Sequence, residues 1–213
     1  MSLVKALVVL GSGGTVATGV YLTSDYWMSS KEGTMVSIKD SLKGKKLISS
    51  IADSEVAKKQ WEAEFDSASD AIKSLLNKSD LTSETGGKAL ESWCSLQMSL
   101  NSHENKEVLS NVEKYCLVRS VASQISRKNK NLLKADVETG WSSTYQKRKA
   151  AQETSNRSSV GLSGAWQEGK ETEELKIIKK WCSDNSEKEF LVSNKGNSDL
   201  YDNVLKWCTQ EGA

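Results

Sequence analysis

The sequence predicts an all-α protein, and three observations carry this prediction. After residue 50 the apolar residues recur at three- and four-residue spacing, and none of the patterns alternates over the length of a strand. The 213 residues contain no proline, so the strongest breaker of long helices is missing. A short motif of an aromatic residue and a cysteine occurs four times, each with an aliphatic residue four positions before the cysteine, which is the spacing of one helical face.

This recurring motif contains all four cysteines of the chain. The four copies are Trp93-Cys94, Tyr115-Cys116, Trp181-Cys182 and Trp207-Cys208. The first and third copies lie 88 residues apart, and the second and fourth lie 92 residues apart. These similar separations predict a tandem duplication, with a first helical repeat over residues 47–131 and a second over residues 132–213.

The first repeat is expected to contain three helices. Its opening helix places Trp61 and Phe65 on one apolar face, and Asp53 is a plausible N-cap. The glycine pair Gly86-Gly87 predicts a turn after this helix. The opening helix is expected at about 53–78 and the turn at 79–88. The second helix is expected at about 89–100 and the third at 106–128.

The second repeat follows the same plan less closely. It opens near Ala135 and carries Trp141 and Tyr145 four residues apart, like the aromatic pair of the first repeat. A turn rich in serine and glycine is expected at 153–164. The two further helices are expected at about 165–183 and 199–209. Together these patterns predict two similar three-helix units.

The longest apolar stretch lies at the N-terminus. Residues 5–22 begin with a lysine and are otherwise uncharged, which is close to the minimum length of a membrane-spanning helix. No convincing small-residue cleavage site accompanies the stretch, so an uncleaved anchor is favoured over a cleaved signal peptide or a buried part of the fold. We therefore expect a single transmembrane anchor over residues 1–24, attached to the membrane through residues 5–22, and a polar tether over residues 25–46.

The orientation of this anchor is only weakly marked in the sequence. Positive charges on its two sides nearly balance. A five-residue leader before a long polar body favours a single-pass protein of the cell membrane with an extracellular body. A body that faces the cytoplasm is the alternative.

Composition excludes one class of partner. The net charge is +1 and the isoelectric point is near 7.6, so the chain lacks the basic surface of a nucleic-acid-binding protein. The mean hydropathy of −0.51 indicates a polar body and excludes a multi-span membrane protein.

The spacing of the cysteines predicts two disulfides. The midpoint between Cys94 and Cys116 is residue 105, inside a turn expected at 101–105, and the midpoint between Cys182 and Cys208 is residue 195, inside a turn expected at 193–199. Residues equidistant from the turn of an antiparallel helical hairpin lie level with each other, because both helices rise equally per residue. In an oxidising compartment, each disulfide would contribute about 3 kcal/mol to the folding stability of its small unit.

The cysteines could also have other roles. Reduced cysteines packed as small core residues beside their aromatic neighbours are the main alternative. A zinc site would need closely spaced ligand pairs, and the sequence has none. A catalytic thiol would need a histidine, and His103 lies in a predicted turn. We therefore predict no catalytic, cofactor or metal site, and no enzyme.

Eight aromatic residues are expected to pack in the two repeats. They are Trp61, Phe65, Trp93, Tyr115, Trp141, Tyr145, Trp181 and Trp207.

Three of the four motif copies also carry a lysine. They read Lys114-Tyr115-Cys116, Lys180-Trp181-Cys182 and Lys206-Trp207-Cys208, whereas Ser92-Trp93-Cys94 departs from the pattern. With the short N-terminal apolar segment and the serine- and lysine-rich body, the whole chain resembles the paralogous membrane-anchored proteins of haemotropic mycoplasmas. The resemblance implies a surface location and a part in host contact or immune variation. It implies no activity and no site.

The expected function is therefore that of a surface-displayed interaction or antigenic module whose partner is a host or extracellular protein. The polar turns at 101–105, 153–164 and 193–199 are the expected binding regions. The alternatives are a cytoplasm-facing helical adaptor and an enzyme whose site cannot be recognised in the sequence.

Overall fold

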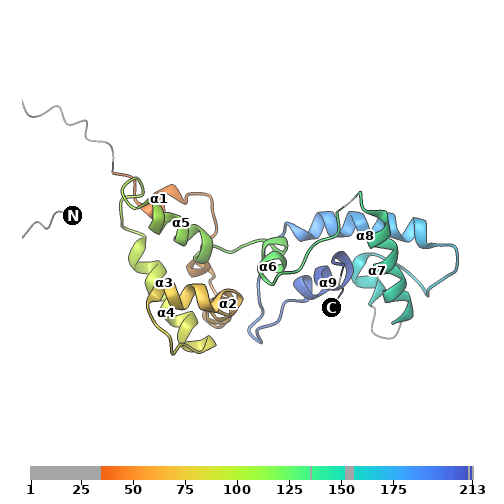
Figure 1. Cartoon of the computed structure of the whole chain (residues 1–213), viewed down its shortest axis with the longest axis horizontal. Coiled ribbons are helices and arrows are strands. Elements are labelled where there is room, and N and C mark those ends of the chain that lie inside the picture. The colour runs from red at the N-terminus through yellow and green to blue at the C-terminus, as the bar shows by residue number, and fades with distance from the viewer. Residues whose placement is uncertain (1–34, 135, 152–155, 211, 213) are drawn as a thin grey trace, which may run out of the picture. The chain divides into compact units, whose positions relative to one another are not determined.

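The computed structural model describes residues 35–134, 136–151, 156–210 and 212. These residues form an all-α fold, which confirms the predicted class (Figure 1). The expected anchor at 1–24 lies outside the described residues. None of the helices in the described part of the chain combines the length and the apolar character that a membrane span requires.

Helices account for all the regular secondary structure in these residues. The elements up to residue 115 are α1 (Ile38–Ser41), η1 (Ile48–Ser50), α2 (Ser54–Ser67), α3 (Ser69–Leu76), α4 (Ser83–Gln97) and α5 (Lys106–Tyr115). The remaining elements are α6 (Val121–Arg127), α7 (Glu138–Ala150), η2 (Arg157–Val160), α8 (Glu171–Ser186) and α9 (Asp199–Cys208). Extended segments meet only at isolated bridges, such as the one between Leu47 and Leu117.

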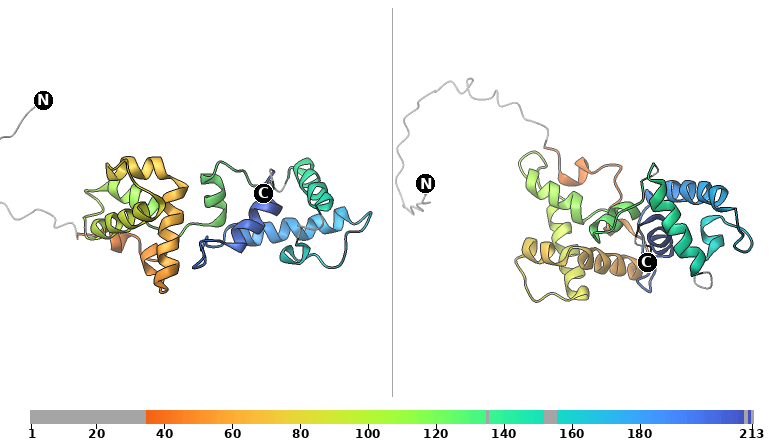
Figure 2. Two further views of the ribbon diagram at one scale, coloured as in Figure 1. Left: turned by 90° about the horizontal axis from the view of Figure 1, so that it is seen from below. Right: turned by 45° about the vertical axis from the view of Figure 1, so that its right-hand side comes forward.

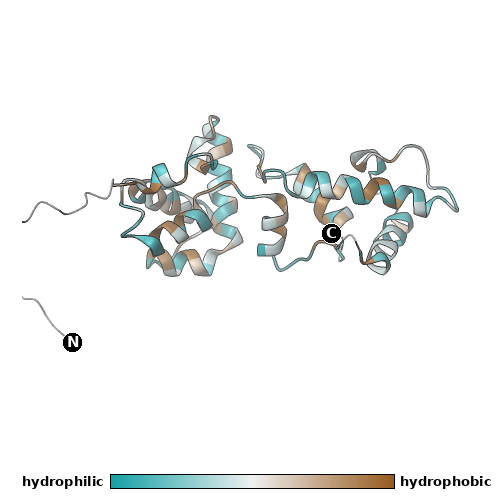
Figure 3. Ribbon diagram, turned by 90° about the horizontal axis from the view of Figure 1, so that it is seen from above, coloured by the Kyte–Doolittle hydropathy of each residue, from teal (hydrophilic) through white to brown (hydrophobic). Residues whose placement is uncertain are grey.

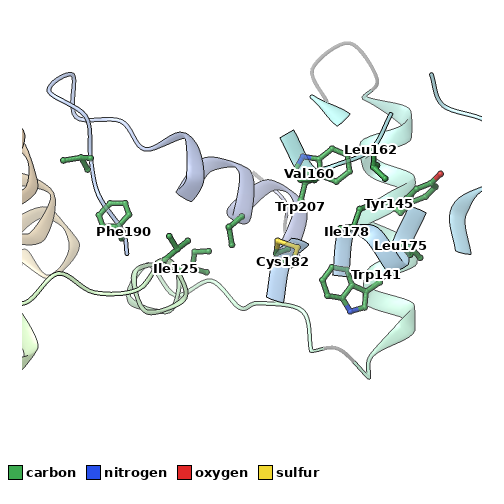
Figure 4. Close-up of a cluster of buried hydrophobic side chains, with 14 residues drawn as sticks. Ile125, Trp141, Tyr145, Val160, Leu162, Leu175, Ile178, Cys182, Phe190 and Trp207 are labelled. Carbon is green, nitrogen blue, oxygen red and sulfur yellow. A yellow bond between two sulfur atoms is a disulfide. The ribbon is translucent and has the colours of Figure 1, made fainter. Parts of the chain in front are cut away.

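The buried apolar side chains form two clusters. The first core consists of Ile38, Leu42, Ile48, Trp61, Phe65, Ile72, Leu90, Cys94, Val112, Tyr115 and Cys116. The second core consists of Val121, Ile125, Trp141, Tyr145, Val160, Leu162, Leu175, Ile178, Cys182, Phe190, Val192, Val204, Trp207 and Cys208, and Figure 4 shows it around the disulfide of Cys182. Apolar and polar residues alternate around the helices, as expected where one face of each is buried (Figure 3).

The glycine pair that predicts a turn lies instead inside α4. Thr82 caps this helix through a capping box with Thr85, so the helix begins before the glycines. A Cβ atom on Gly86 would stand 2.4 Å from the Phe65 ring, and one on Gly87 would stand 2.8 Å from the Glu62 backbone nitrogen. The glycines therefore allow α2 and α4 to lie side by side in close contact (Figure 2).

Two long helices expected in the first repeat are each divided. The helix expected at 53–78 breaks at Ala68, where the backbone has φ −152° and ψ 39°, and forms α2 and α3. The helix expected at 106–128 forms α5 and α6, because the backbone between them is extended and Val121 N–H donates to the Lys188 carbonyl. Val121 and Ile125 of α6 pack into the second core, although both residues belong to the first repeat expected at 47–131.

The described part of the expected tether is folded onto the first core. Ile38 and Leu42 are buried, and the Ile38 N–H donates to the Leu100 carbonyl at 2.8 Å. This packing could not be predicted, because α1 has a single turn, which is too short to show helical periodicity in the sequence.

In the second repeat, α9 begins and ends close to the expected positions. α8 starts later than expected, at Glu171, and continues to Ser186. Within the turn expected at 153–164, residues 157–160 form η2, whose Val160 is buried in the second core. Residues 157–160 therefore contribute to packing, which was not expected of a surface turn.

Buried polar side chains of α2 connect the two cores. The Gln60 amide donates to the Phe190 carbonyl at 3.1 Å and accepts from the Val192 N–H at 3.0 Å. One turn later the buried Glu64 carboxylate accepts hydrogen bonds from Arg119 and Arg127, with Arg127 Nη1 2.6 Å from Oε1. These contacts join α2 to segments that pack with the second core.

Candidate functional site

The four cysteines lie in the two pairs that the register argument predicts. The Cα atoms of Cys94 and Cys116 are 5.9 Å apart, and those of Cys182 and Cys208 are 5.7 Å apart, both at disulfide distance. Each pair lies within one core, so each joins two helices that would otherwise depend on a small apolar cluster.

The eight expected aromatic residues divide into two groups. The two that precede Cys94 and Cys182, Trp93 and Trp181, are only half-buried. The other six are almost fully buried, namely Trp61, Phe65, Tyr115, Trp141, Tyr145 and Trp207.

The expected binding turns are compact hydrogen-bonded structures where the structure describes them. In the turn at 193–199, the Ser193 N–H donates to the Asn197 carbonyl at 2.7 Å. In the turn at 101–105, the Asn101 side chain accepts from the exposed His103 N–H at 2.9 Å. His103 has no catalytic neighbour in these contacts.

A groove of about 820 Å³ lies between α7 and α8. It is lined mainly by charged, hydroxyl and amide side chains, with the buried Leu175 as an apolar part of its wall. Its lining residues include Glu138, Thr139, Ser142, Gln146, Lys149, Glu168, Glu171, Thr172, Lys176 and Lys179. The three lysines and three glutamates among them balance, so the groove carries both signs of charge.

Cross-groove contacts fix several of these side chains. Lys179 of α8 forms an ion pair with Glu138 of α7. The Glu171 carboxylate accepts hydrogen bonds from the Ser142 hydroxyl and the Gln146 amide. The two helices are thus held at a defined separation with polar groups facing the groove between them.

The groove follows from a difference between the two halves of the chain. The third cysteine motif follows the first by 88 residues, so Glu174 and Leu175 of α8 match Gly86 and Gly87 of α4. The glycines let α2 and α4 pack backbone against side chain, whereas the larger residues require more space between α7 and α8. The wide groove is therefore specific to the second half.

A hydrogen-bonded network occupies the position where the glycines stand in the first half. The Tyr145 hydroxyl donates to Glu174 Oε2 at 2.9 Å. Arg157 donates to both oxygens of the same carboxylate, at 2.7 and 2.9 Å. The hydrogen bonds to Glu174, mainly those from Arg157, lower the pKa of its carboxyl group. Burial, followed by the Glu174 carboxylate, raises the pKa of Tyr145 to about 12.

Trp166 covers this network. The Arg157 guanidinium lies over the Trp166 ring at 4.3 Å from its centroid, a favourable cation–π distance. Trp166 in turn packs edge-on against Tyr145 at 5.2 Å and stacks near Trp207 at 6.3 Å. The network therefore stabilises the wall behind the groove, and its groups have a structural part to play.

A smaller groove of about 560 Å³ lies at the matching place between α2 and α4. Its lining includes Lys58 and Glu91, which match Glu138 and Lys179 of the larger groove, so the charges on the two helices are exchanged. Lys58 Nζ lies 2.7 Å from Glu84 Oε1, across the groove.

Comparisons with known proteins found no matching family model, no matching curated protein and no matching solved structure. Within the described residues no cluster of three or more His, Cys, Asp or Glu side chains is arranged to hold a metal ion.

Sequence reasoning missed the groove, although one signal was present. The glycine pair of the first half and Glu174-Leu175 of the second stand at matching distances from their cysteine motifs. Such a change from the smallest residues to large ones at a helix contact predicts a wider separation of the helices.

Proposed function

We propose that this chain is a membrane-anchored, surface-displayed interaction module whose partner, a host or extracellular protein, docks in the groove between α7 and α8. The observation that carries the proposal is that groove, which presents both signs of charge on two helices tied to a disulfide-containing core. Mixed charges beside an apolar wall suit a polypeptide segment, which can supply apolar and charged side chains along one face.

The cysteine pairs support the extracellular location. Disulfides persist in oxidising surroundings and are rare where thiol reductants dominate. All four cysteines lie at disulfide distance within their own cores, an arrangement that favours a body outside the cell. A cytoplasm-facing adaptor would keep these cysteines reduced.

We also propose that the two halves are tandem repeats. Matching contacts support this: the Ile48 N–H donates to the Cys116 carbonyl at 3.0 Å, and the Leu133 N–H donates to the Cys208 carbonyl at 2.8 Å. A repeated unit with one diverged groove is a plausible route to a new binding surface on an established scaffold.

Protease treatment of intact cells that express the full chain tests the location. Cleavage of the body without lysis, and digestion of a cytoplasmic marker only after lysis, is the expected result. Protection of the body until lysis would reject surface display and favour the adaptor.

A further inference from the structure

The two disulfides have different surroundings. The Cys182–Cys208 pair lines a cavity of about 190 Å³ together with Leu133, Lys179 and Ser186. Cys182 is 5 % exposed and Cys208 is 1 % exposed. A cavity of this volume is large enough to admit water and the end of a small flexible molecule.

The residues at the matching places in the first half are larger or more deeply buried. Ser186 lies four residues after Cys182, and the residue four positions after Cys94 is Met98, whose side chain packs against the first core. Leu133 is half-buried, whereas Ile48, which makes the same backbone contact to the cysteine carbonyl, is completely buried. A serine for a methionine leaves free volume beside the second disulfide.

The charge near the second disulfide also differs. Lys179 lines the cavity, and its ammonium group, which also pairs with Glu138, lies 5.7 Å from the centroid of the Trp141 ring. The residue of α4 that matches Lys179 is Glu91. A nearby cation attracts an incoming thiolate and stabilises the cysteine thiolate that is released. A nearby carboxylate repels the first and destabilises the second.

We propose that this cavity is a site of thiol–disulfide exchange, at which a small anionic thiol selectively attacks the Cys182–Cys208 disulfide. The incoming thiolate forms a bond to Sγ of Cys182, the more exposed of the two cysteines. The bond between the two protein sulfurs breaks, and Cys208 leaves as a thiolate that takes a proton from water. A second thiol then displaces Cys182 and leaves as the oxidised dimer of the small thiol.

Differential alkylation tests this proposal on the full chain in mild detergent. The protein is exposed to reduced glutathione for increasing times, free thiols are alkylated, and each cysteine is followed by peptide mass spectrometry. We expect Cys182 and Cys208 to become alkylated on the order of tenfold faster than Cys94 and Cys116, because access and local charge set the exchange rate. Equal rates, or faster reaction of Cys94 and Cys116, would overturn the proposal.

Two reciprocal variants test the cavity as the cause. Ser186→Met should slow alkylation of the second pair towards the rate of the first, and Met98→Ser should accelerate the first pair. Circular dichroism before exposure to the thiol establishes that each variant is folded. If both variants are folded and neither rate changes, the cavity does not control access and the proposal fails.

A third variant tests the charge. Lys179→Gln should reduce the preference for glutathione, which is anionic, over the neutral thiol mercaptoethanol. An unchanged preference would remove Lys179 from the proposed site. These measurements do not depend on the orientation of the chain in a membrane, so they can fail or succeed independently of the proposed surface display.

Discussion

The Tyr145 hydroxyl donates a hydrogen bond of 2.9 Å to the Glu174 carboxylate. At the matching place in the first half, the Phe65 ring packs directly on Gly86. A phenol and a carboxylate thus stand where the first half has an aromatic ring and a glycine, and a groove of about 820 Å³ lies between the helices that carry them. The groove at this helix contact is therefore larger in the second half than the matching groove in the first half.

Gly86→Ala is expected to destabilise the first core. The added Cβ would stand 2.4 Å from the ring of the buried Phe65, and such overpacking typically costs about 1–3 kcal/mol, which exceeds the gain in helix propensity of up to about 1 kcal/mol. The free energy of unfolding from denaturant titration measures the effect. Ser92→Ala, on the exposed face of the same helix, is the control and should have little effect. Equal stability of the two variants would contradict the close contact.

Glu64→Gln is expected to be strongly destabilising. The variant leaves the guanidinium groups of Arg119 and Arg127 without the carboxylate that both contact, and removing one partner of a buried ion pair typically costs about 3–5 kcal/mol. Burial raises the pKa of Glu64, and the two arginines oppose that shift. The matched control is Glu113→Gln, which breaks an exposed pair with Lys45 and should cost at most about 1 kcal/mol. Similar losses in the free energy of unfolding for both variants would show that the buried contacts of Glu64 with Arg119 and Arg127 do not stabilise the fold.

How much the sequence could predict depended on the range of the interactions. The pairing of Cys94 with Cys116 followed from local register, because a helical hairpin fixes the level of each residue. The role of Gly86 could not be found in the same way, since a glycine pair marks turns and also close helix contacts, and only the position of Phe65 distinguishes the two. The burial of Ile38 is equally non-local, because its helix has one turn and takes its stability from the first core.

Acid should weaken the second core through Glu174. Its hydrogen bonds from Arg157 lower the pKa of the carboxyl in the folded protein, so the folded state holds the proton less strongly than the unfolded chain. The stabilisation is therefore fully present above the unfolded pKa of about 4.3 and is lost as the pH falls through the lower, folded pKa. Denaturant titrations from pH 6 downwards measure this loss relative to Glu174→Gln. If the original chain and Glu174→Gln lose the same stability as the pH falls, the Arg157–Glu174 contact is not the cause of the acid sensitivity.

Alkali should act through Tyr145 in the opposite direction. Burial, followed by the Glu174 carboxylate, raises its pKa to about 12. The resulting stabilisation is fully present below the unfolded pKa of about 10 and is lost as the pH rises through about 12. Absorbance at the phenolate band, compared with Tyr145→Phe, should show one tyrosine that titrates late. A difference spectrum that titrates near pH 10 would contradict the buried hydrogen bond.

The groove between α7 and α8 should be the part of the surface that contacts the partner. A photoreactive amino acid in place of Thr172, which lines the groove, is expected to cross-link a polypeptide when intact cells displaying the chain are irradiated in contact with host cells. The same group in place of Ser143, which is exposed on α7 and lies outside the groove lining, is the matched control and should cross-link several-fold less. The cross-link at Thr172 should also weaken with the charge reversal Lys176→Glu, because the rim charges orient a bound segment. Equal cross-linking from both positions would show that the groove is not the contact surface, and a cross-link to a lipid or glycan alone would reject a polypeptide partner.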